Sequence, residues 1–246
     1  MKRLLALLLA LFMIVGMVVT ASAVVLTEEE TEDSKIMFNN CESKDGWWSS
    51  SGNPTVDPTE KTEGNASILL TYSKYSGKPG DIQFAYALTE PVDSSRSTTF
   101  SFDLWVGTDA EAKALSEAPV WIELTSSGTC DKLEKSASFG LNDLVTGGVK
   151  KGWNRVTVPL GGMNPAGGQD KEPMDPSKCN FMRMFSAADF SYLNGNSLTI
   201  RVDNFHFDSP TLSDGDYVAD CDKADGWSAP GGVTFSVDNV NKTQGE

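Results

Sequence analysis

Apolar and polar residues alternate along most of the chain, in short runs that Gly, Pro, Asn, Asp and Ser interrupt. Alternation with a period of two is typical of a strand that buries one face, and turn residues mark where such strands end. Only residues 110–117 have the spacing of a helix. Many short strands predict an all-β fold, an antiparallel β-sandwich or barrel. The predicted strands cover residues 35–40, 66–72, 82–88, 98–106, 120–125, 136–141, 154–160, 180–185 and 198–207.

Two of these strands, TFSFDLWV and VWIELT, place large polar and aromatic residues opposite their apolar residues. If the two strands pair as neighbours, one face carries Trp105, Trp121, Asp103 and Glu123. Aromatic rings stack on the apolar faces of sugars, and carboxylates accept hydrogen bonds from sugar hydroxyls. The pattern therefore predicts a sugar-binding platform. The alternative is that a loop or a neighbouring domain covers the two tryptophans.

Two arginines join this face if their strands belong to the same sheet. Arg183 alternates with Met182 and Met184, and Arg201 alternates with the apolar residues of the last strand. Guanidinium groups donate hydrogen bonds with fixed geometry to sugar hydroxyls or carboxylates. Alternatively, the two arginines form cross-strand salt bridges with the acids of the same face. Both interpretations are open.

The N-terminus has the form of a secretory signal. Lys2 and Arg3 precede an apolar run that ends at the small-residue motif Ala21-Ser22-Ala23, which predicts a signal peptide over residues 1–23. A membrane anchor is the alternative, but the run is short and no second apolar span follows. Residues 24–35 contain a run of acids, which predicts a disordered leader. We expect a secreted, extracellular protein with no membrane segment in the mature chain.

The net charge of −14 restricts the possible partners. An acidic chain repels phosphate, which argues against nucleic acid and anionic membranes and leaves neutral polysaccharide or oligosaccharide compatible. The four cysteines allow three disulfide pairings, between which the sequence does not decide, and their spacing is not that of a zinc site. They are Cys41, Cys130, Cys179 and Cys221.

An internal repeat suggests the domain boundaries. Residues 41–64 recur with changes at residues 221–245, including the motif Asp-Gly-Trp and the terminal Gly. A repeat of this kind indicates tandem units, here with a second copy that stops after its first strands. We therefore expect a larger multi-domain secreted protein, although the tail could instead pair with the first domain. The predicted parts are a domain over 36–208, a linker over 209–216 and a truncated second copy over 217–246.

Three segments carry a family resemblance: GWNRVTVPL at 152–160, DPSKCNFMRMF at 175–185 and LTIRVDNFHF at 198–207. They resemble the closing strands of galactose-binding-like β-jelly-roll domains, which include many non-catalytic carbohydrate-binding modules of secreted polysaccharide-degrading enzymes. Cys179 and Met182 stand where isoleucines are usual. The resemblance implies a jelly-roll fold over residues 36–208 and carbohydrate binding.

The same resemblance implies a structural calcium ion. In such modules an acidic residue near the first strand and an aspartate in the last strand often bind Ca²⁺, which needs six to eight oxygen ligands. The matching residues are Glu42 or Asp45, together with Asp203. The alternative is that an acid-rich chain places carboxylates here without a metal.

Three functions compete. The first is non-catalytic carbohydrate binding, and the second is a structural or adhesive module without glycan affinity. The third is a glycoside hydrolase that uses Asp103 and Glu123, because a retaining enzyme needs two carboxyl groups about 5 Å apart. A general acid also needs a carboxyl shielded from solvent, and the sequence gives no sign of a deep cleft. We therefore favour carbohydrate binding and no enzymatic activity.

Overall fold

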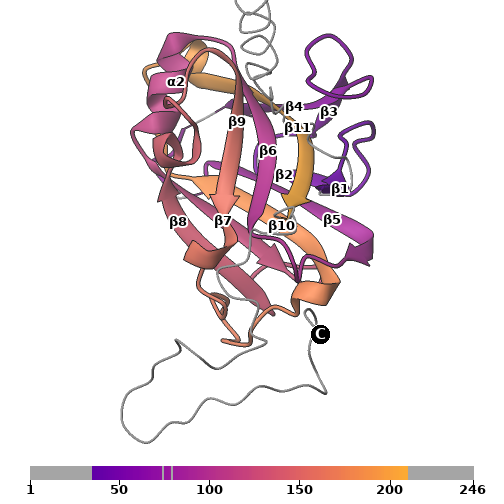
Figure 1. Cartoon of the computed structure of the whole chain (residues 1–246). Helices are drawn as coiled ribbons and strands as arrows, with labels where there is room; N and C mark the ends of the chain where they lie inside the picture. The colour runs from indigo at the N-terminus through magenta and orange to yellow at the C-terminus, as the bar shows by residue number, and fades with distance from the viewer. Residues whose placement is uncertain (1–34, 74, 79, 210–246) are drawn as a thin grey trace, which may run out of the picture. The chain divides into compact units, whose positions relative to one another are not determined.

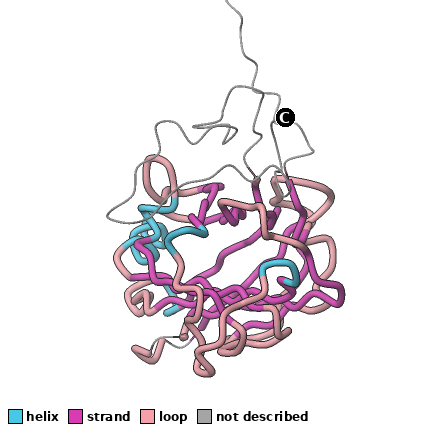
Figure 2. Tube along the Cα trace, turned by 60° about the horizontal axis from the view of Figure 1, so that its bottom comes forward, coloured by secondary structure: helices cyan, strands magenta, loops and turns pink. Residues whose placement is uncertain are grey.

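The chain folds into two antiparallel β-sheets that pack face to face. The structure, a computed structural model, describes residues 35–73, 75–78 and 80–209. Figures 1 and 2 show the sheets as two layers, with loops and short helices at their edges. The predicted β-sandwich is confirmed. The predicted signal peptide, the leader before residue 35, the linker after residue 209 and the second copy all lie outside the described residues.

The first sheet, sheet A, has the strand order β3-β4-β11-β6-β9, and β1 pairs with the second half of β11. A bulge between Asp203 and His206 shifts the register of β11 against β6, with Asn204 in the left-handed conformation (φ 53°). The bulge leaves both Asp203 and His206 on the outer face of the sheet. The strands are β1 (Lys35–Asn39), β3 (Thr55–Asp57), β4 (Ser67–Ser73), β6 (Thr99–Val106), β9 (Gly152–Pro159) and β11 (Ser197–Asp208).

The second sheet, sheet B, has the strand order β2-β5-β10-β7-β8. Its strands are β2 (Trp47–Ser49), β5 (Ile82–Val92), β7 (Pro119–Thr125), β8 (Glu134–Gly140) and β10 (Cys179–Ser186). Every predicted strand occurs in one of the two sheets. Only β2 and β3 were not expected, since each has three residues and alternation cannot show in so short a run.

The core lies between the sheets and is built by the alternation seen in the sequence. Phe102 of β6 and Ile122 of β7 are fully buried from opposite sheets. Phe102 also stacks on Phe205 of β11, with ring centroids 4.9 Å apart and planes 10° apart. Each buried side chain of this size stabilises the fold by about 1.5–3 kcal/mol. The alternation therefore fixes which side of each strand faces solvent.

The connection between β6 and β7 crosses from sheet A to sheet B. It contains helix α2 (Asp109–Ser116), which Thr108 caps by accepting a hydrogen bond from the backbone N–H of Glu111 at 3.2 Å. Leu115 of this helix is buried in the core. A connection of this length and apolar content spans two layers, whereas hairpins use two to five residues. The prediction that residues 99–106 and 120–125 pair as neighbours is therefore wrong.

The remaining elements are single turns of 3₁₀-helix: η2 (Leu141–Leu144), η3 (Leu160–Gly162), η4 (Pro176–Lys178) and η5 (Asn194–Asn196). Cys41, Cys130 and Cys179 are free thiols, and Cys221 lies outside the described residues. Within residues 35–209, where described, no helix has the length and apolar content that a membrane crossing requires.

Candidate functional site

The six side chains predicted to form one platform lie on two separate faces. The outer face of sheet A carries Trp105, Asp103 and Arg201. The outer face of sheet B carries Trp121, Glu123 and Arg183. Because both sheets and the core separate these faces, no single ligand surface can include all six. The prediction of one shared platform is wrong, and its cause is the assignment of β6 and β7 to different sheets.

An aromatic stack lies on the outer face of sheet B. Trp121 of β7 is directly opposite Phe185 of β10, and their rings stack with centroids 5.1 Å apart and planes 3° apart. Both side chains are half-buried. The guanidinium carbon of Arg183 lies over the Phe185 ring, 5.1 Å from its centroid. The stack is partly exposed and has a cation at its side, and each ring covers one face of the other.

A third aromatic residue belongs to the same face. Trp48 of β2 is opposite Ala85 of β5, which in turn is opposite Arg183 of β10. Trp48 is 50% exposed, the second highest exposure among the large apolar side chains in the described residues. Because alanine ends at Cβ, Trp48 and Arg183 project beyond Ala85 on either side. We define the sheet B face as Trp48, Trp121, Arg183 and Phe185.

Arg183 is held in place by two acids. Its Nε donates to Glu123 Oε2 in a very short bond, and its Nη2 donates to Asp131 Oδ1 at 3.0 Å. The backbone N–H of Asp131 also donates to Glu123 Oε1 at 2.6 Å. The side chain of Glu123 is 1% exposed and that of Arg183 is 15% exposed. The cross-strand salt bridge considered for Glu123 is therefore present, and Glu123 is too buried to contact a ligand.

A third acid completes this group. Burial and contact with the Glu134 carboxyl raise the pKa of Glu123 above its ordinary value, against the effect of Arg183. Oε2 of Glu134 is buried and has no hydrogen-bond partner among the described residues. One carboxylate oxygen from each of three residues lies within 4.8 Å of the others, and we call this group the acidic cluster: Glu123, Asp131 and Glu134. No pattern in the sequence predicts this cluster, because Asp131 lies in a turn and Glu134 is the first residue of β8.

On the outer face of sheet A, Trp105 is already covered on one side. The guanidinium carbon of Arg201 lies 4.1 Å from the centroid of the Trp105 ring. Arg201 Nε donates to Asp57 Oδ2 at 2.6 Å, so its salt-bridge partner is Asp57 and not Asp103. Hydrogen bonds from the Thr59 side chain, and then Arg201, lower the pKa of Asp57 to about 2 although burial opposes this. The arginine therefore occupies one face of the Trp105 ring.

Asp103 is also committed to the protein's own contacts. Its Oδ1 accepts from Arg155 Nε at 2.6 Å, and its Oδ2 accepts from the Thr62 hydroxyl at 2.6 Å. Asp103 is 4% exposed. Because Asp103 and Glu123 lie on the outer faces of opposite sheets, they cannot act as the two carboxyl groups of a glycosidase.

Two of the residues matched to a calcium site, Asp203 and Glu42, bind the loop before β4. Asp203 Oδ2 accepts from the backbone N–H groups of Thr62 and Glu63 at 2.7 and 3.1 Å. Glu42 Oε1 accepts from the N–H of Asn65 at 2.5 Å. Glu42 and the exposed Asp45 line a pocket of about 320 Å³, and Asp203 does not. A cation at these three residues stays a prediction.

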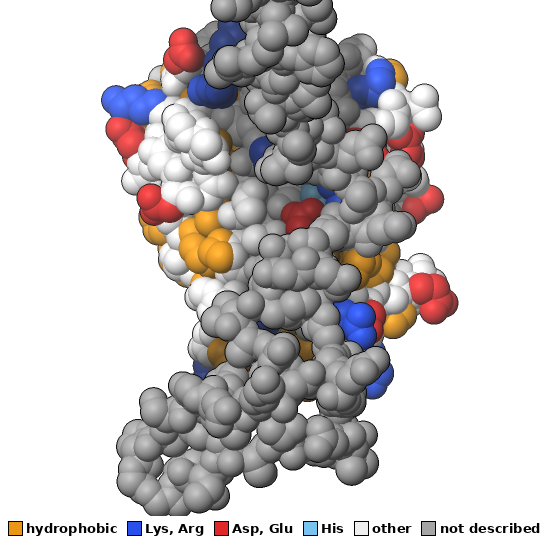
Figure 3. All heavy atoms as spheres, in the orientation of Figure 1, with side chains coloured by type: hydrophobic (Ala, Val, Ile, Leu, Met, Phe, Trp, Pro, Cys, Tyr) orange, Lys and Arg blue, Asp and Glu red, His pale blue; other side chains and the backbone are white. Residues whose placement is uncertain are grey.

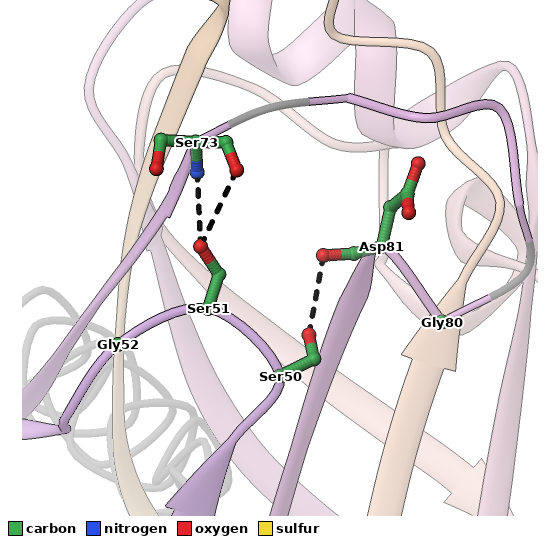
Figure 4. A pocket seen from close by; sticks show the side chains of 6 residues that line it. All are labelled: Ser50, Ser51, Gly52, Ser73, Gly80 and Asp81. Atoms are coloured by element: carbon green, nitrogen blue, oxygen red, sulfur yellow. Dashed lines mark hydrogen bonds between the residues drawn. The ribbon is translucent and has the colours of Figure 1, made fainter.

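A pocket that the sequence did not predict opens beside β2 (Figure 4). It has a volume of about 440 Å³. Ser51 Oγ lies 3.1 Å from the backbone N–H of Ser73, and Ser50 Oγ donates to the carbonyl of Asp81 at 3.2 Å. The Asp81 carboxylate is bound by Ser76 of its own loop. The polar atoms that line this pocket are therefore largely used in hydrogen bonds between its own loops.

Charged side chains do not gather by sign on the visible surface. Figure 3 shows acidic and basic side chains interspersed with hydrophobic ones. The described residues that are visible in this view form no basic patch, and the net charge of −14 argues against nucleic acid. The fold and the sheet B face define a β-sandwich module with an aromatic outer surface.

Known structures share this architecture. A family 11 carbohydrate-binding module from Clostridium thermocellum, solved with a β-1,3-1,4-mixed-linked tetrasaccharide, is 16% identical, with a TM-score of 0.46 over 71% of this chain and 95% of that chain. A family 30 module of a cellulosomal cellulase from Clostridium thermocellum is 17% identical, with a TM-score of 0.47 over 72% of this chain and 99% of that chain. Part of an exo-β-agarase is 13% identical, with a TM-score of 0.44 over 75% of this chain and 26% of that chain. No protein-family model and no curated protein matches the sequence.

Proposed function

We propose that this protein is a non-catalytic, extracellular module that binds a neutral polysaccharide or oligosaccharide on the sheet B face. The observation that carries the proposal is the group of aromatic side chains on one outer sheet surface, the half-buried Trp121–Phe185 stack and the 50% exposed Trp48. Burial normally claims residues of this size, so half-buried rings on an outer face need an explanation. Stacking on the apolar faces of pyranose rings provides one.

The charged groups of the face have separate roles in this proposal. Arg183 supplies the hydrogen-bond donor for sugar hydroxyls, because its side chain is partly exposed and lies at the edge of the stack. Glu123 is a positioning residue, because its buried carboxyl group accepts the hydrogen bond from Arg183 Nε. Trp48 extends the apolar surface across Ala85 toward β2. Trp105, Asp103 and Arg201 lie on the opposite face and are not part of the proposed site.

Affinity electrophoresis in gels containing soluble neutral polysaccharides tests the proposal. We expect retardation of the wild type by at least one of β-glucan, xylan and galactomannan. Trp121→Ala should weaken binding about five- to tenfold, from about 1–1.5 kcal/mol of stacking. Trp105→Ala is the matched control, since it removes the same side chain from the other face. If the wild type binds no glycan of a broad panel, a structural or adhesive module becomes the better description.

A further inference from the structure

The acidic cluster has the spacing of a cation site. Its three carboxylate oxygens lie within 4.8 Å of one another. Ca²⁺ binds oxygen at about 2.3–2.6 Å, so two oxygens on one ion are at most about 5 Å apart. A single ion can therefore contact all three residues with small side-chain movements.

One polar atom of the cluster also lacks a partner. Oε2 of Glu134 is buried without a hydrogen bond, in a residue that is 4% exposed. A buried carboxylate oxygen without a partner is costly, and native proteins satisfy such atoms with a donor, a water or an ion. Arg183 contacts Glu123 and Asp131, and no hydrogen bond joins it to Glu134. One guanidinium opposite three carboxylates leaves room for positive charge beside Glu134.

The surrounding backbone encloses the cluster but leaves an entrance. A Cβ at Gly167 would lie 2.0 Å from Ser136 Oγ and 3.0 Å from Glu134 Oε1, so this loop packs closely over the acids. The N–H of Gly167 donates to the carbonyl of Glu134 at 3.2 Å. The side chain of Asp131 is 39% exposed, which places it on the solvent side. An ion would enter past Asp131 and lie against Glu134.

We infer that the acidic cluster of Glu123, Asp131 and Glu134 binds one divalent cation of the calcium type. The ion joins the β7–β8 turn to the loop that covers it, and Glu134 Oε2 becomes a ligand. This site is separate from the one predicted at Glu42, Asp45 and Asp203, and it does not depend on glycan binding.

The test is calcium titration by calorimetry of the full chain after treatment with a chelator. It is paired with luminescence of Tb³⁺ excited through tryptophan, because Trp121 lies two residues from Glu123 on the same face. We expect one bound ion at this site and sensitised Tb³⁺ emission that Ca²⁺ displaces. Glu134→Gln should weaken binding at least about tenfold. Glu42→Gln should leave this ion bound, which distinguishes the two sites.

Asp131→Asn provides a second variant in case Glu134→Gln fails to fold, since the Asp131 side chain is partly exposed. It should also weaken binding of the ion and reduce Tb³⁺ emission. Absence of any bound ion in the wild type overturns the inference. So does calcium binding that Glu134→Gln and Asp131→Asn leave unchanged and that Glu42→Gln abolishes.

Discussion

Removing the Arg183 guanidinium is expected to destabilise the fold strongly. Arg183→Met keeps the length of the side chain and its packing on Phe185 but leaves Glu123, 1% exposed, without its cation. Breaking a buried ion pair on one side costs about 3–5 kcal/mol when the remaining charge stays buried. Because the pKa of Glu123 is already raised to about 8, its carboxyl takes up a proton at neutral pH once Arg183 is gone, and we expect a loss toward the lower end of that range. Urea unfolding followed by tryptophan fluorescence, with a chelator present, measures the loss.

Two further variants make this prediction specific. Lys113→Met removes an exposed pair with Glu117, 3.6 Å apart, and should cost less than about 1 kcal/mol. The double variant Arg183→Met/Glu123→Gln should recover much of the loss, because no unpaired charge is then buried at this position. A loss below about 1 kcal/mol for Arg183→Met alone would refute the reasoning.

Two other predictions concern the backbone and acid stability. Gly46→Ala should destabilise the fold by about 1–3 kcal/mol more than Gly52→Ala in thermal melts. Both glycines have positive φ, but a Cβ at Gly46 would lie 2.7 Å from the carbonyl of Ala87, whereas nothing lies within 4 Å at Gly52; equal losses would contradict this. The pKa of Asp57, about 2 in the fold, means that its contribution is present above its unfolded pKa near 4 and is lost as pH falls toward 2. Below pH 4 the free energy of unfolding should therefore depend less on pH in Asp57→Asn than in the wild type. The same dependence in both proteins would count against this pKa for Asp57.

Alternation predicted the strands well because it reports on one physical event, the burial of one face. In β6 it separated the buried Phe102 and Leu104 from the outward Asp103 and Trp105 correctly. It contains no information on which strand lies beside which. β6 and β7 do not pair, because the connection that contains helix α2 carries the chain from one sheet to the other.

The candidate site was predictable only in part, for the same reason. Trp121 and Arg183 were correctly placed on an outer face. Phe185 has the same signal as Arg183, since both alternate with the buried Met184, but the apolar character of phenylalanine predicts an inward side chain. The burial of Glu123 and its contact with Asp131 depend on the turn after β7, whose shape no periodic pattern encodes.

The sheet B face is the proposed sugar-binding surface, and the indole N–H signals in ¹H–¹⁵N spectra test this most directly. Titration with an oligosaccharide of the retarding polysaccharide should shift the signals of Trp121 and Trp48 and leave those of Trp105 and Trp153, on the outer face of sheet A, unchanged. Shifts confined to Trp105 and Trp153, or no shift with any glycan, would contradict the account.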